Sequence, residues 1–370
     1  MEIVTLSIGR NILKSGSRDR LRMALYARHM DAFHIVVLTR RTHGYSEVVH
    51  EGNLHLYPTN SRSRLMMLID AFRSTVGILR NGNTHVRTLT AQDPLELGVL
   101  SYLTSKYTKT PYTVQVHGDY YSDAWTEGSI TRRLRRRVIP FVLRHAQKVR
   151  VVSERIRASL IRIGVPDTKI HVLPIRPELD VFRTAGEHKQ LPEAFTVLTA
   201  SRLAPEKNIP LLIHAFALLH KKYPEVRLRI AGEGEEQSRI ETCIKRLRLE
   251  DAVTLIPWTH SIAYEMANAH VFALASLHEA YSLVLIEALA TGTPVVTTDV
   301  GCVGEVVQDG VHGIVVPVGD EVAFGAALTR MYEAPRFRSE AGLNGCALRE
   351  ALARVSEDTY AKEWVSCHSL

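Results

Sequence analysis

The sequence predicts an α/β protein made of two doubly wound domains that face each other across a cleft. The chain has 370 residues, enough for two hydrophobic cores, and its composition of 45% hydrophobic and 23% charged residues is that of a globular protein. Short β-branched runs alternate with helical stretches along the whole chain, a rhythm typical of parallel sheets. A polar, proline-bearing segment near the middle divides this series into halves.

The expected strands are short and separated by helical stretches. In the first half they are Ile3–Leu6, Ile35–Leu38, Val114–Val116 and Val149–Val152. In the second half they are Thr196–Thr199, Arg227–Ala231, Val253–Ile256, Val271–Ala273 and Pro294–Thr297. This order predicts two Rossmann-like domains.

The domain boundary is expected where the strand and helix rhythm stops. Prolines at 174 and 177 and the polar stretch 184–192 interrupt it, so we expect an N-terminal domain over 1–183 and a C-terminal domain over 184–349. Residues 350–370 have helical apolar spacing, with Tyr360 and Trp364, and no strand follows them. They predict a terminal helix that packs back on the N-terminal domain.

The charge distribution indicates which partners the protein binds, and the cysteine content indicates its cellular environment. Residues 1–190 hold 30 Lys and Arg against 16 Asp and Glu, about +14, whereas the rest holds 16 against 23, about −7. A basic half favours anionic partners such as phosphorylated lipids, acidic glycans or nucleic acid. The four cysteines have no metal-site spacing, and no run approaches the roughly 18 apolar residues of a membrane span. We expect a cytoplasmic protein, in solution or peripheral at the inner face of the membrane.

A carboxylate lies on the apolar face of the helix predicted within residues 276–307. Ser282 is the expected N-cap and Gly292 the expected stop, and Glu287 shares its helical stripe with apolar residues. A buried carboxylate is retained when a cation or a ligand supplies hydrogen-bond partners, and a ribose diol offers two donors. The alternative is that a core arginine neutralises Glu287.

A second acid, Glu279, precedes the same helix. The backbone amides of Tyr281, Ser282 and Leu283 are expected to bind an anion there, at the positive end of the helix. The alternative is that Glu279 is a solvated loop residue.

Two cations follow the strand predicted at 196–199. Arg202 and Lys207 lie at its carboxyl end, the edge where ligands bind in doubly wound folds. Fixed positive charge there stabilises an anion such as a departing diphosphate, with Arg202 as a planar fork and Lys207 as a point charge. The alternative is that both are ordinary surface charges.

Two further strands end in residues suited to a site. Gly232 and Gly234 follow 227–231 and allow close backbone approach to a ligand, or form a simple turn. His117 follows the strand expected at 114–116, which places its imidazole at the carboxyl edge of the first sheet. The alternative is that His117 has a purely structural role. No second ligand at suitable spacing supports a metal at His117.

These motifs together resemble those of a known family. Two glutamates eight residues apart, then Ala-x-x-x-Gly-x-Pro-Val-Val, and Arg202 followed by Glu206 and Lys207, resemble retaining GT-B glycosyltransferases of the family 4 type, the glycosyl transferases group 1. The resemblance is strong over 195–320, moderate over 85–183 and weak before that. It implies the GT-B fold, with acceptor binding in 1–183 and nucleotide-sugar binding in 184–349.

The resemblance also implies a role for each candidate residue. Glu287 holds the nucleotide ribose, Glu279 contacts donor-sugar hydroxyls, and Arg202 and Lys207 bind the diphosphate. His117 lies near the transferred sugar, for hydrogen bonding or for stabilising charge. The loop of Gly9 corresponds to one near the diphosphate and the acceptor. The implied catalytic residues are His117, Arg202, Lys207 and Glu279, and the implied donor-binding residues are Gly9, Gly232, Gly234, Tyr281, Ser282, Leu283 and Glu287.

The implied activity is transfer of a hexose from a UDP- or GDP-sugar to a glycan or lipid-linked acceptor, with retention of configuration. No metal is implied, in agreement with the absence of Asp-x-Asp, and no cofactor besides the nucleotide sugar as co-substrate. Three segments depart from the family pattern: Asn208 replaces a glycine, the first loop lacks paired glycines, and 173–182 lacks Asn-Gly. The altered first loop and 173–182 leave a non-catalytic donor- or glycan-binding subunit as an alternative, and a nucleotide-sugar epimerase on the same fold is another.

The segment 131–150 is strongly basic with an apolar core. It is suited to anionic lipid or to a phosphorylated acceptor, or it is a solvated helix face. No aromatic-interleaved or helix-turn-helix pattern accompanies it, so we do not expect nucleic acid as a partner.

Overall fold

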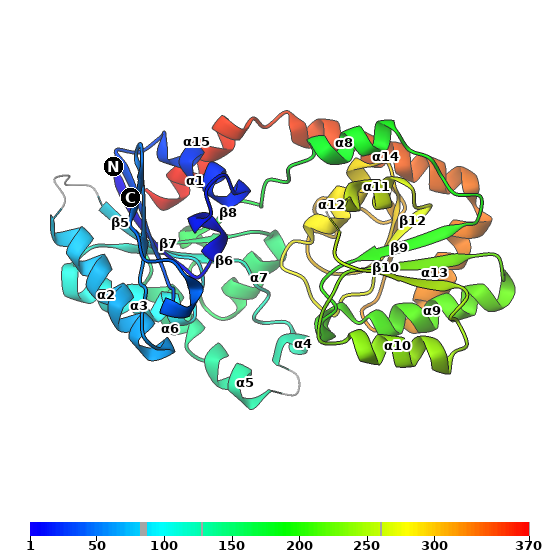
Figure 1. Cartoon of the computed structure of the whole chain (residues 1–370), viewed down its shortest axis with the longest axis horizontal. Coiled ribbons are helices and arrows are strands. Elements are labelled where there is room, and N and C mark those ends of the chain that lie inside the picture. The colour runs from blue at the N-terminus through cyan, green and yellow to red at the C-terminus, as the bar shows by residue number, and fades with distance from the viewer. Residues whose placement is uncertain (82–86, 127–128, 260, 370) are drawn as a thin grey trace. The chain divides into compact units, whose positions relative to one another are not determined.

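The computed structural model describes residues 1–81, 87–126, 129–259 and 261–369. Two compact units divide the chain (Figure 1). The first contains Met1–Tyr121, Thr126–Pro174 and Ser356–Leu370, and the second contains Ser122–Trp125 and Ile175–Val355. The chain therefore passes between units after Pro174, whereas the sequence led us to expect a boundary after residue 183. The difference arises because α8 (Asp180–Glu187) packs on α11 (Ile262–Ala267) of the second unit.

The first unit is an eight-stranded sheet in the order β3-β4-β2-β1-β5-β6-β7-β8, parallel except for β3. Its strands are β1 Glu2–Ser7, β2 Ala32–Val37, β3 Val49–Glu51, β4 Leu54–Pro58, β5 Arg87–Ala91, β6 Tyr112–Val116, β7 Lys148–Val151 and β8 Ile170–Val172. Its helices are α1 Arg18–Ala27, α2 Arg64–Asn81, α3 Glu96–Thr108, α5 Ile130–Arg136, α6 Ile139–His145, α7 Glu154–Arg162 and α15 Glu357–His368, and the short α4 Asp123–Thr126 bridges the division.

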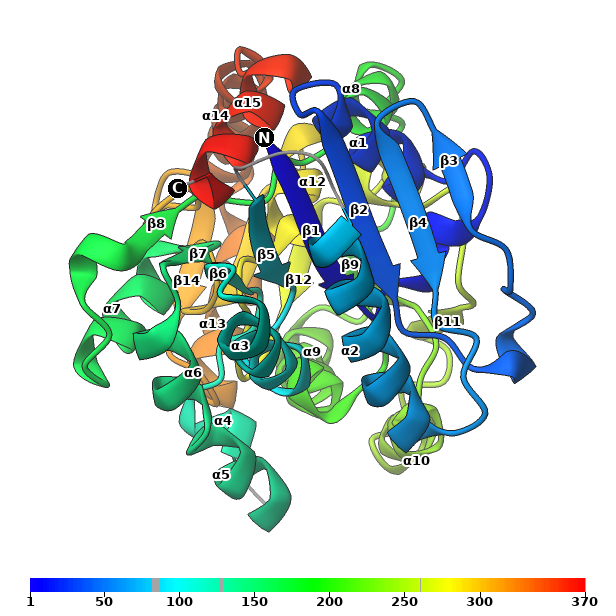
Figure 2. The same cartoon turned by 90° about the vertical axis from the view of Figure 1, so that its left-hand side faces the viewer.

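Helices cover both faces of this sheet, with α2, α3 and α6 on one and α1 and α15 on the other (Figures 1 and 2). Trp364 of α15 stacks on Tyr26 of α1, with ring centroids 5.0 Å apart, and also contacts Phe33 of β2. Residues 350–353 are the end of α14 (Pro335–Ala353), and the terminal helix α15 begins only at Glu357. The side chain of Ser356 accepts a hydrogen bond from the Thr359 amide and so starts α15.

The second unit is a six-stranded, fully parallel sheet in the order β11-β10-β9-β12-β13-β14. Its strands are β9 Thr196–Ala200, β10 Arg227–Ala231, β11 Val253–Ile256, β12 Val271–Leu274, β13 Val295–Thr298 and β14 Gly313–Val316. Its remaining helices are α9 Ile209–Lys222, α10 Gln237–Arg246, α12 Leu283–Ala290, α13 Glu321–Glu333 and α14 Pro335–Ala353. The strand order reverses between β9 and β12, which is the switch point where doubly wound sheets bind ligands.

The two units confirm the expected fold class. β9 and β12 are buried along their whole length, as their continuous β-branched and apolar sequences predict for a parallel sheet covered on both faces. In Figure 1, α9, α10 and α13 lie on one face of the second sheet, and α8, α11, α12 and α14 on the other. The loops after β9 and β12 thus emerge side by side.

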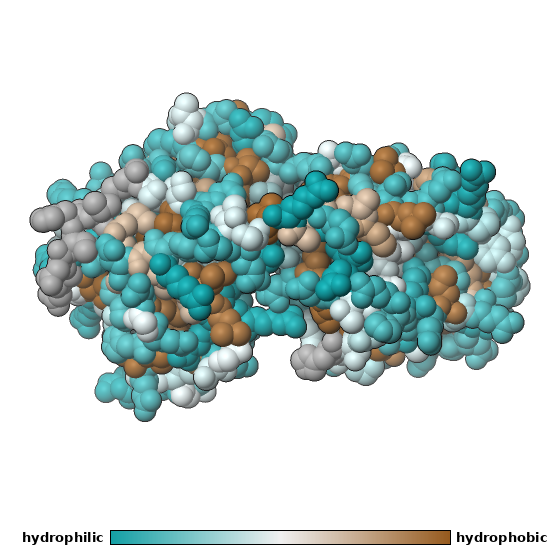
Figure 3. Space-filling model, turned by 90° about the horizontal axis from the view of Figure 1, so that it is seen from above, coloured by the Kyte–Doolittle hydropathy of each residue, from teal (hydrophilic) through white to brown (hydrophobic). Residues whose placement is uncertain are grey.

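No helix in the described ranges has the length and apolar character needed to cross a membrane. On the face drawn in Figure 3, hydrophobic residues form small groups bordered by hydrophilic ones.

Candidate functional site

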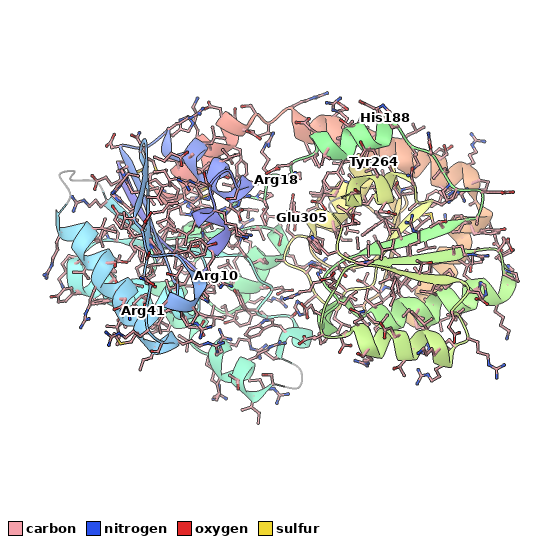
Figure 4. All side chains as sticks on the ribbon, in the orientation of Figure 1. Arg10, Arg18, Arg41, His188, Tyr264 and Glu305 are labelled. Carbon is pink, nitrogen blue, oxygen red and sulfur yellow. The ribbon has the colours of Figure 1, made fainter. Side chains whose placement is uncertain are left out.

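A cavity of about 390 Å³ opens at the switch point of the second unit. Its walls come from the carboxyl ends of β9 and β10, from α11, whose Tyr264 is labelled in Figure 4, and from the first turns of α12. The lining residues are Ala200, Ser201, Arg202, Lys207, Ala231, Gly232, Trp258, Thr259, Ile262, Met266, Val284 and Glu287. Arg202, Lys207, Gly232 and Glu287, all selected from the sequence, therefore meet in one place.

Lys207 and Glu279 form an ion pair across the switch point. The Nζ of Lys207 lies 2.5 Å from Oε1 of Glu279, and the two side chains are 17% and 13% exposed. Ser276, at the end of β12, donates its hydroxyl to the same Oε1 at 2.7 Å. The amide of Leu277 donates to the carbonyl of Glu206 at 2.8 Å, which ties the two loops together. The cation and the acid are thus held in fixed positions.

Arg202 is far more exposed than Lys207. Its side chain is 71% exposed and its Nη2 lies 2.5 Å from Oε1 of Glu206. It lines the rim of the cavity, but its guanidinium is held by a neighbour on its own loop. A ligand could recruit it by replacing that pairing.

Glu287 lines the cavity from α12. Its side chain is half-buried, whereas its position on the apolar stripe led us to expect a buried carboxylate. Ile286 and Ala288 on either side are buried. The expectation was wrong in degree because the cavity gives this part of the helix access to solvent.

Helix α12 begins at the expected position but with a different cap. Ser282 has a left-handed backbone, φ 67°, and its side chain makes no capping hydrogen bond. The amide of Cys302 donates to the carbonyl of Tyr281 at 2.9 Å, and a side chain at Gly301 would collide with Ser282. The loop of Gly301 and Cys302 thus covers this end of the helix. The first two amides of α12, those of Leu283 and Val284, have no carbonyl within the helix to donate to, and Val284 lines the cavity.

Gly232 and Gly234 are explained by backbone packing. Gly232 has φ 141°, and a Cβ there would collide with the carbonyl oxygen of Ser201, as one at Gly234 would with that of Leu203. The amide of Ser201 donates to the carbonyl of Ala231 at 3.0 Å. The two glycines let adjacent loops run in contact, and of the pair it is Gly232 that lines the cavity.

His117 and Gly9 belong to the first unit, at the carboxyl ends of β6 and β1. The His117 Nε2 lies 3.2 Å from Oε1 of Gln115. Desolvation, then the charges of Arg150 and Arg22, lower the pKa of His117 from 6.5 to about 3. The residue is nonetheless exposed, so the two guanidinium charges are the firmer cause, and they act in the same direction: the imidazole is neutral at pH 7.

Gly9 begins the loop that carries Arg10, labelled in Figure 4. Its amide donates to the Ser7 hydroxyl at 3.0 Å, and its φ of −75° suits any residue. A glycine at this position is therefore not needed for an unusual backbone conformation. It would instead let the protein backbone approach a ligand closely.

Several lining residues were not selected from the sequence. Trp258 and Thr259 follow β11, and Ile262 and Met266 lie on α11. The rule that ligands bind at the carboxyl ends of parallel strands applied equally to β11, so Trp258 could have been found. Within the described ranges, no group of three or more His, Cys, Asp or Glu side chains is arranged to hold a metal ion.

Comparison with known proteins agrees with this geometry. The family Glycosyl transferases group 1 matches residues 184–346, and the Glycosyl transferase 4-like domain matches residues 16–176. An exopolysaccharide phosphotransferase of Streptomyces coelicolor is 32% identical over 194 residues, 49% of this chain and 20% of that protein. The putative glycosyltransferase EpsD of Bacillus subtilis is 29% identical over 216 residues, 56% of this chain and 57% of EpsD. The chain thus spans less than two thirds of the length of each of these two relatives.

Among solved structures, Anabaena HepE in complex with UDP superimposes with a TM-score of 0.76 over 99% of both chains, at 20% identity. That likeness shows the GT-B fold. Residues 184–346 thus belong to the glycosyl transferases group 1 and residues 16–176 to the glycosyl transferase 4-like domains, and the two matches together span most of the chain.

Proposed function

We propose that this protein transfers a hexose from a UDP- or GDP-sugar to a glycan or lipid-linked acceptor, with retention of configuration and without a metal. The products would serve cell-surface polysaccharide, lipopolysaccharide or glycolipid synthesis at the cytoplasmic face of the membrane. The observation that carries the proposal is the cavity at the switch point. Lys207 and Glu287 both line it, and Lys207 forms an ion pair with Glu279. UDP bound to HepE supports a nucleotide as the ligand of this fold.

Each of these side chains has a chemical task in the proposal. Glu287 accepts hydrogen bonds from the ribose diol, because its half-buried carboxylate faces a cavity of the size that holds small ligands. Lys207 stabilises the charge that the diphosphate gains on leaving, since a fixed ammonium needs no reorganisation during the reaction. Arg202 joins it from the rim by exchanging Glu206 for phosphate.

Glu279 acts on the sugar in this proposal. When a diphosphate takes the Lys207 ammonium, the Glu279 carboxylate loses its ionic partner and keeps the Ser276 hydroxyl. It is then able to accept hydrogen bonds from donor-sugar hydroxyls. The present ion pair therefore keeps both groups in place and charged before the donor binds.

Thermal-shift measurements against a panel of UDP- and GDP-sugars test donor binding. A rise in melting temperature is expected for at least one donor and should be weakened in Glu287→Gln. Glu333→Gln, which removes a surface carboxylate paired with Lys222, is the matched control and should bind as the wild type does. No shift with any nucleotide sugar would contradict the proposal.

Turnover then separates the alternatives. A transferase consumes its donor when an acceptor is supplied, with the sugar recovered on the acceptor. Isomerisation of the donor without an acceptor would point to an epimerase. Donor binding with no turnover across glycan and lipid-linked acceptors would point to a non-catalytic subunit.

We further infer that the acceptor side meets an anionic lipid bilayer. Helices α2, α3 and α6 lie side by side in the first unit, and α5 is joined to the start of α3 by the ion pair of Arg135 with Glu96 (Figures 1 and 2). This surface, here called the basic face, exposes the apolar residues Leu65, Leu103, Tyr107, Ile130, Leu134 and Phe141. It also exposes the cations Arg62, Arg64, Lys106, Lys109, Arg133 and Arg137. Exposed apolar side chains and cations on the same helices suit the headgroup region of anionic lipid.

Sedimentation with vesicles tests the basic face. The protein is expected to bind phosphatidylglycerol-containing vesicles, to release them as salt is raised, and not to bind phosphatidylcholine alone. The double variant Ile130→Glu, Leu134→Glu should lose binding, whereas Leu343→Glu, on an exposed position of α14, should keep it. Equal binding by both variants would overturn the inference.

A further inference from the structure

Among the residues that the structure describes, the buried Arg150 has no acidic partner, and it lies next to His117. Arg150 of β7 is 4% exposed, and its guanidinium donates to the Leu173 carbonyl from Nε at 3.2 Å and from Nη2 at 3.0 Å. Nη2 also donates to the Tyr360 hydroxyl at 3.0 Å, and Nη1 to Oε1 of Gln115 at 2.9 Å. Every acceptor that the described residues offer Arg150 is neutral, so its charge is hydrogen-bonded but not compensated.

Such an arrangement is costly unless the charge has a use. Removing an ionised side chain from water costs several kcal/mol, and buried cations are usually paired with an acid. The field of Arg150 reaches its neighbours, since after desolvation it contributes to lowering the pKa of both His117 and His368. The side chain of Gln115 connects Arg150 to His117, because it contacts both of them.

Gln115 has only one orientation that satisfies this network. A guanidinium has donors and no acceptor, so the Gln115 amide must present its oxygen to Arg150. The same Oε1 lies 3.2 Å from the Nε2 of His117. An oxygen can only accept, so the Nε2 of His117 must carry the hydrogen in this bond. In a neutral imidazole the other nitrogen, Nδ1, is then an acceptor.

We propose that Arg150, acting through Gln115, fixes His117 as the neutral tautomer protonated at Nε2, so that Nδ1 accepts a hydrogen bond from a hydroxyl of the transferred sugar. Arg150 is thereby a positioning residue. The identity of the ligand rests on the proposed function, whereas the tautomer does not. A histidine so held cannot donate a proton from Nδ1 or supply positive charge. Of the two tasks expected for it, hydrogen bonding to the sugar is the one that it can perform.

NMR of protein labelled at histidine tests the tautomer directly, with the His117 signals assigned from their loss in His117→Gln. The Cδ2 shift and the two-bond nitrogen correlations are expected to show a proton on Nε2 and a bare Nδ1 at pH 7. An Nδ1-protonated or doubly protonated ring in the wild type would overturn the proposal, whatever the activity of the enzyme.

Two variants separate the Gln115 link from general repacking. Gln115→Leu and Tyr360→Phe each remove one neutral acceptor of Arg150, but only Gln115 contacts His117. Gln115→Leu is expected to give mixed tautomers, and Tyr360→Phe a ring like that of the wild type. Equal changes in the two variants, or no change in Gln115→Leu, would refute the role of Gln115. Gln115→Asn, which shortens the side chain but keeps the amide, should restore the tautomer partly.

Turnover tests whether Nδ1 accepts a hydrogen bond from the sugar. This test does not depend on the folding of the Gln115 and Tyr360 variants. An asparagine oxygen lies near the position of Nδ1, and a glutamine amide reaches that of Nε2. His117→Asn is therefore expected to retain about tenfold more activity than His117→Gln, the value of one hydrogen bond. The reverse order would exclude Nδ1 as the contact. If no nucleotide sugar is turned over at all, the proposed function fails while the NMR result still decides the tautomer.

Discussion

At the scale of single residues, the site depends on groups that other groups hold in place. Lys207 is fixed by Glu279, Glu279 by Ser276, and His117 by Gln115. Arg202 differs, because its side chain extends into solvent with a partner on its own loop. Pre-placed charges act on a transition state without first reorganising, which makes Lys207 the stronger candidate of the two cations.

Lys207→Ala is therefore expected to slow turnover by about 10²-fold or more, while donor binding changes less. Steady-state kinetics with the donor found by thermal shift would measure this. Lys222→Ala, which removes a surface lysine paired with Glu333, serves as the control and should leave kcat unchanged. Wild-type kinetics in Lys207→Ala would exclude this lysine from the chemistry.

Gly232 should tolerate no side chain. Its φ of 141° is unfavourable for other residues, and a Cβ would meet the Ser201 carbonyl. Gly232→Ala is expected to destabilise the second unit by about 3 kcal/mol, from backbone strain and overpacking together. Urea denaturation measures the loss. Gly319→Ala, where φ is 81° but the space is open, should lose only about 1 kcal/mol.

At the scale of elements, the sequence predicted best those strands that are buried on both faces. β9, β12 and β13 were found because their β-branched and apolar runs are typical of buried parallel strands. β4 alternates Leu with His and ends at a proline, and β8 has three residues, so neither gives that signal.

Part of the site could be predicted from the rule that ligands bind at the carboxyl ends of parallel strands. That rule, with the helical stripe of α12, selected Lys207, Arg202 and Glu287 before any geometry was known. It could not show that Lys207 pairs with Glu279, because that contact depends on how two loops far apart in the sequence meet. Nor could it show that Glu287 is half-buried, since a cavity is a property of packing rather than of helical spacing.

The edge formed by β2, β3 and β4 is expected to make the first unit sensitive to acid. Desolvation, followed by the charges of His55, Arg87 and His50 and opposed by Glu2, lowers the pKa of His34 from 6.5 to about 4. Between these values the unfolded chain binds a proton that the folded unit does not. Stability should therefore fall as pH is lowered from about 6.5 towards about 4.

Denaturation midpoints measured at intervals across this pH range would test the effect. His34→Asn should flatten the dependence, because the residue that titrates differently in the two states is gone. His188→Asn, which changes a histidine exposed at the end of α8 (Figure 4), is the control and should keep it. A wild-type protein whose stability is constant down to pH 4 would refute the prediction.

At the scale of the whole molecule, the first unit is built from segments separated by the entire second unit. The hydrophobic core on one face of its sheet is completed by α15, whose Trp364 is 4% exposed and stacks on Tyr26. The Tyr360 hydroxyl also donates to the Pro174 carbonyl at 2.6 Å, next to the point where the chain first leaves the unit. The outgoing and returning segments are therefore joined within the first unit.

Trp364→Ala should destabilise the first unit by about 3–5 kcal/mol, the usual effect of removing a large buried aromatic side chain. Differential scanning calorimetry would measure it as a lower melting temperature of one unit. Trp258→Ala removes an exposed tryptophan and should change stability by no more than about 0.5 kcal/mol. Equal losses in the two variants would show that α15 is not part of the first unit's core.

This arrangement also sets an order of assembly on the ribosome. The strands β1 to β8 emerge first, yet the helix that covers Tyr26 and Phe33 follows only after all of residues 175–355 have been translated. Until then an aromatic surface of the nascent amino-terminal sheet stays uncovered, whereas the later unit already has every segment that it needs. The part of the protein that is synthesised first is consequently the last to be finished.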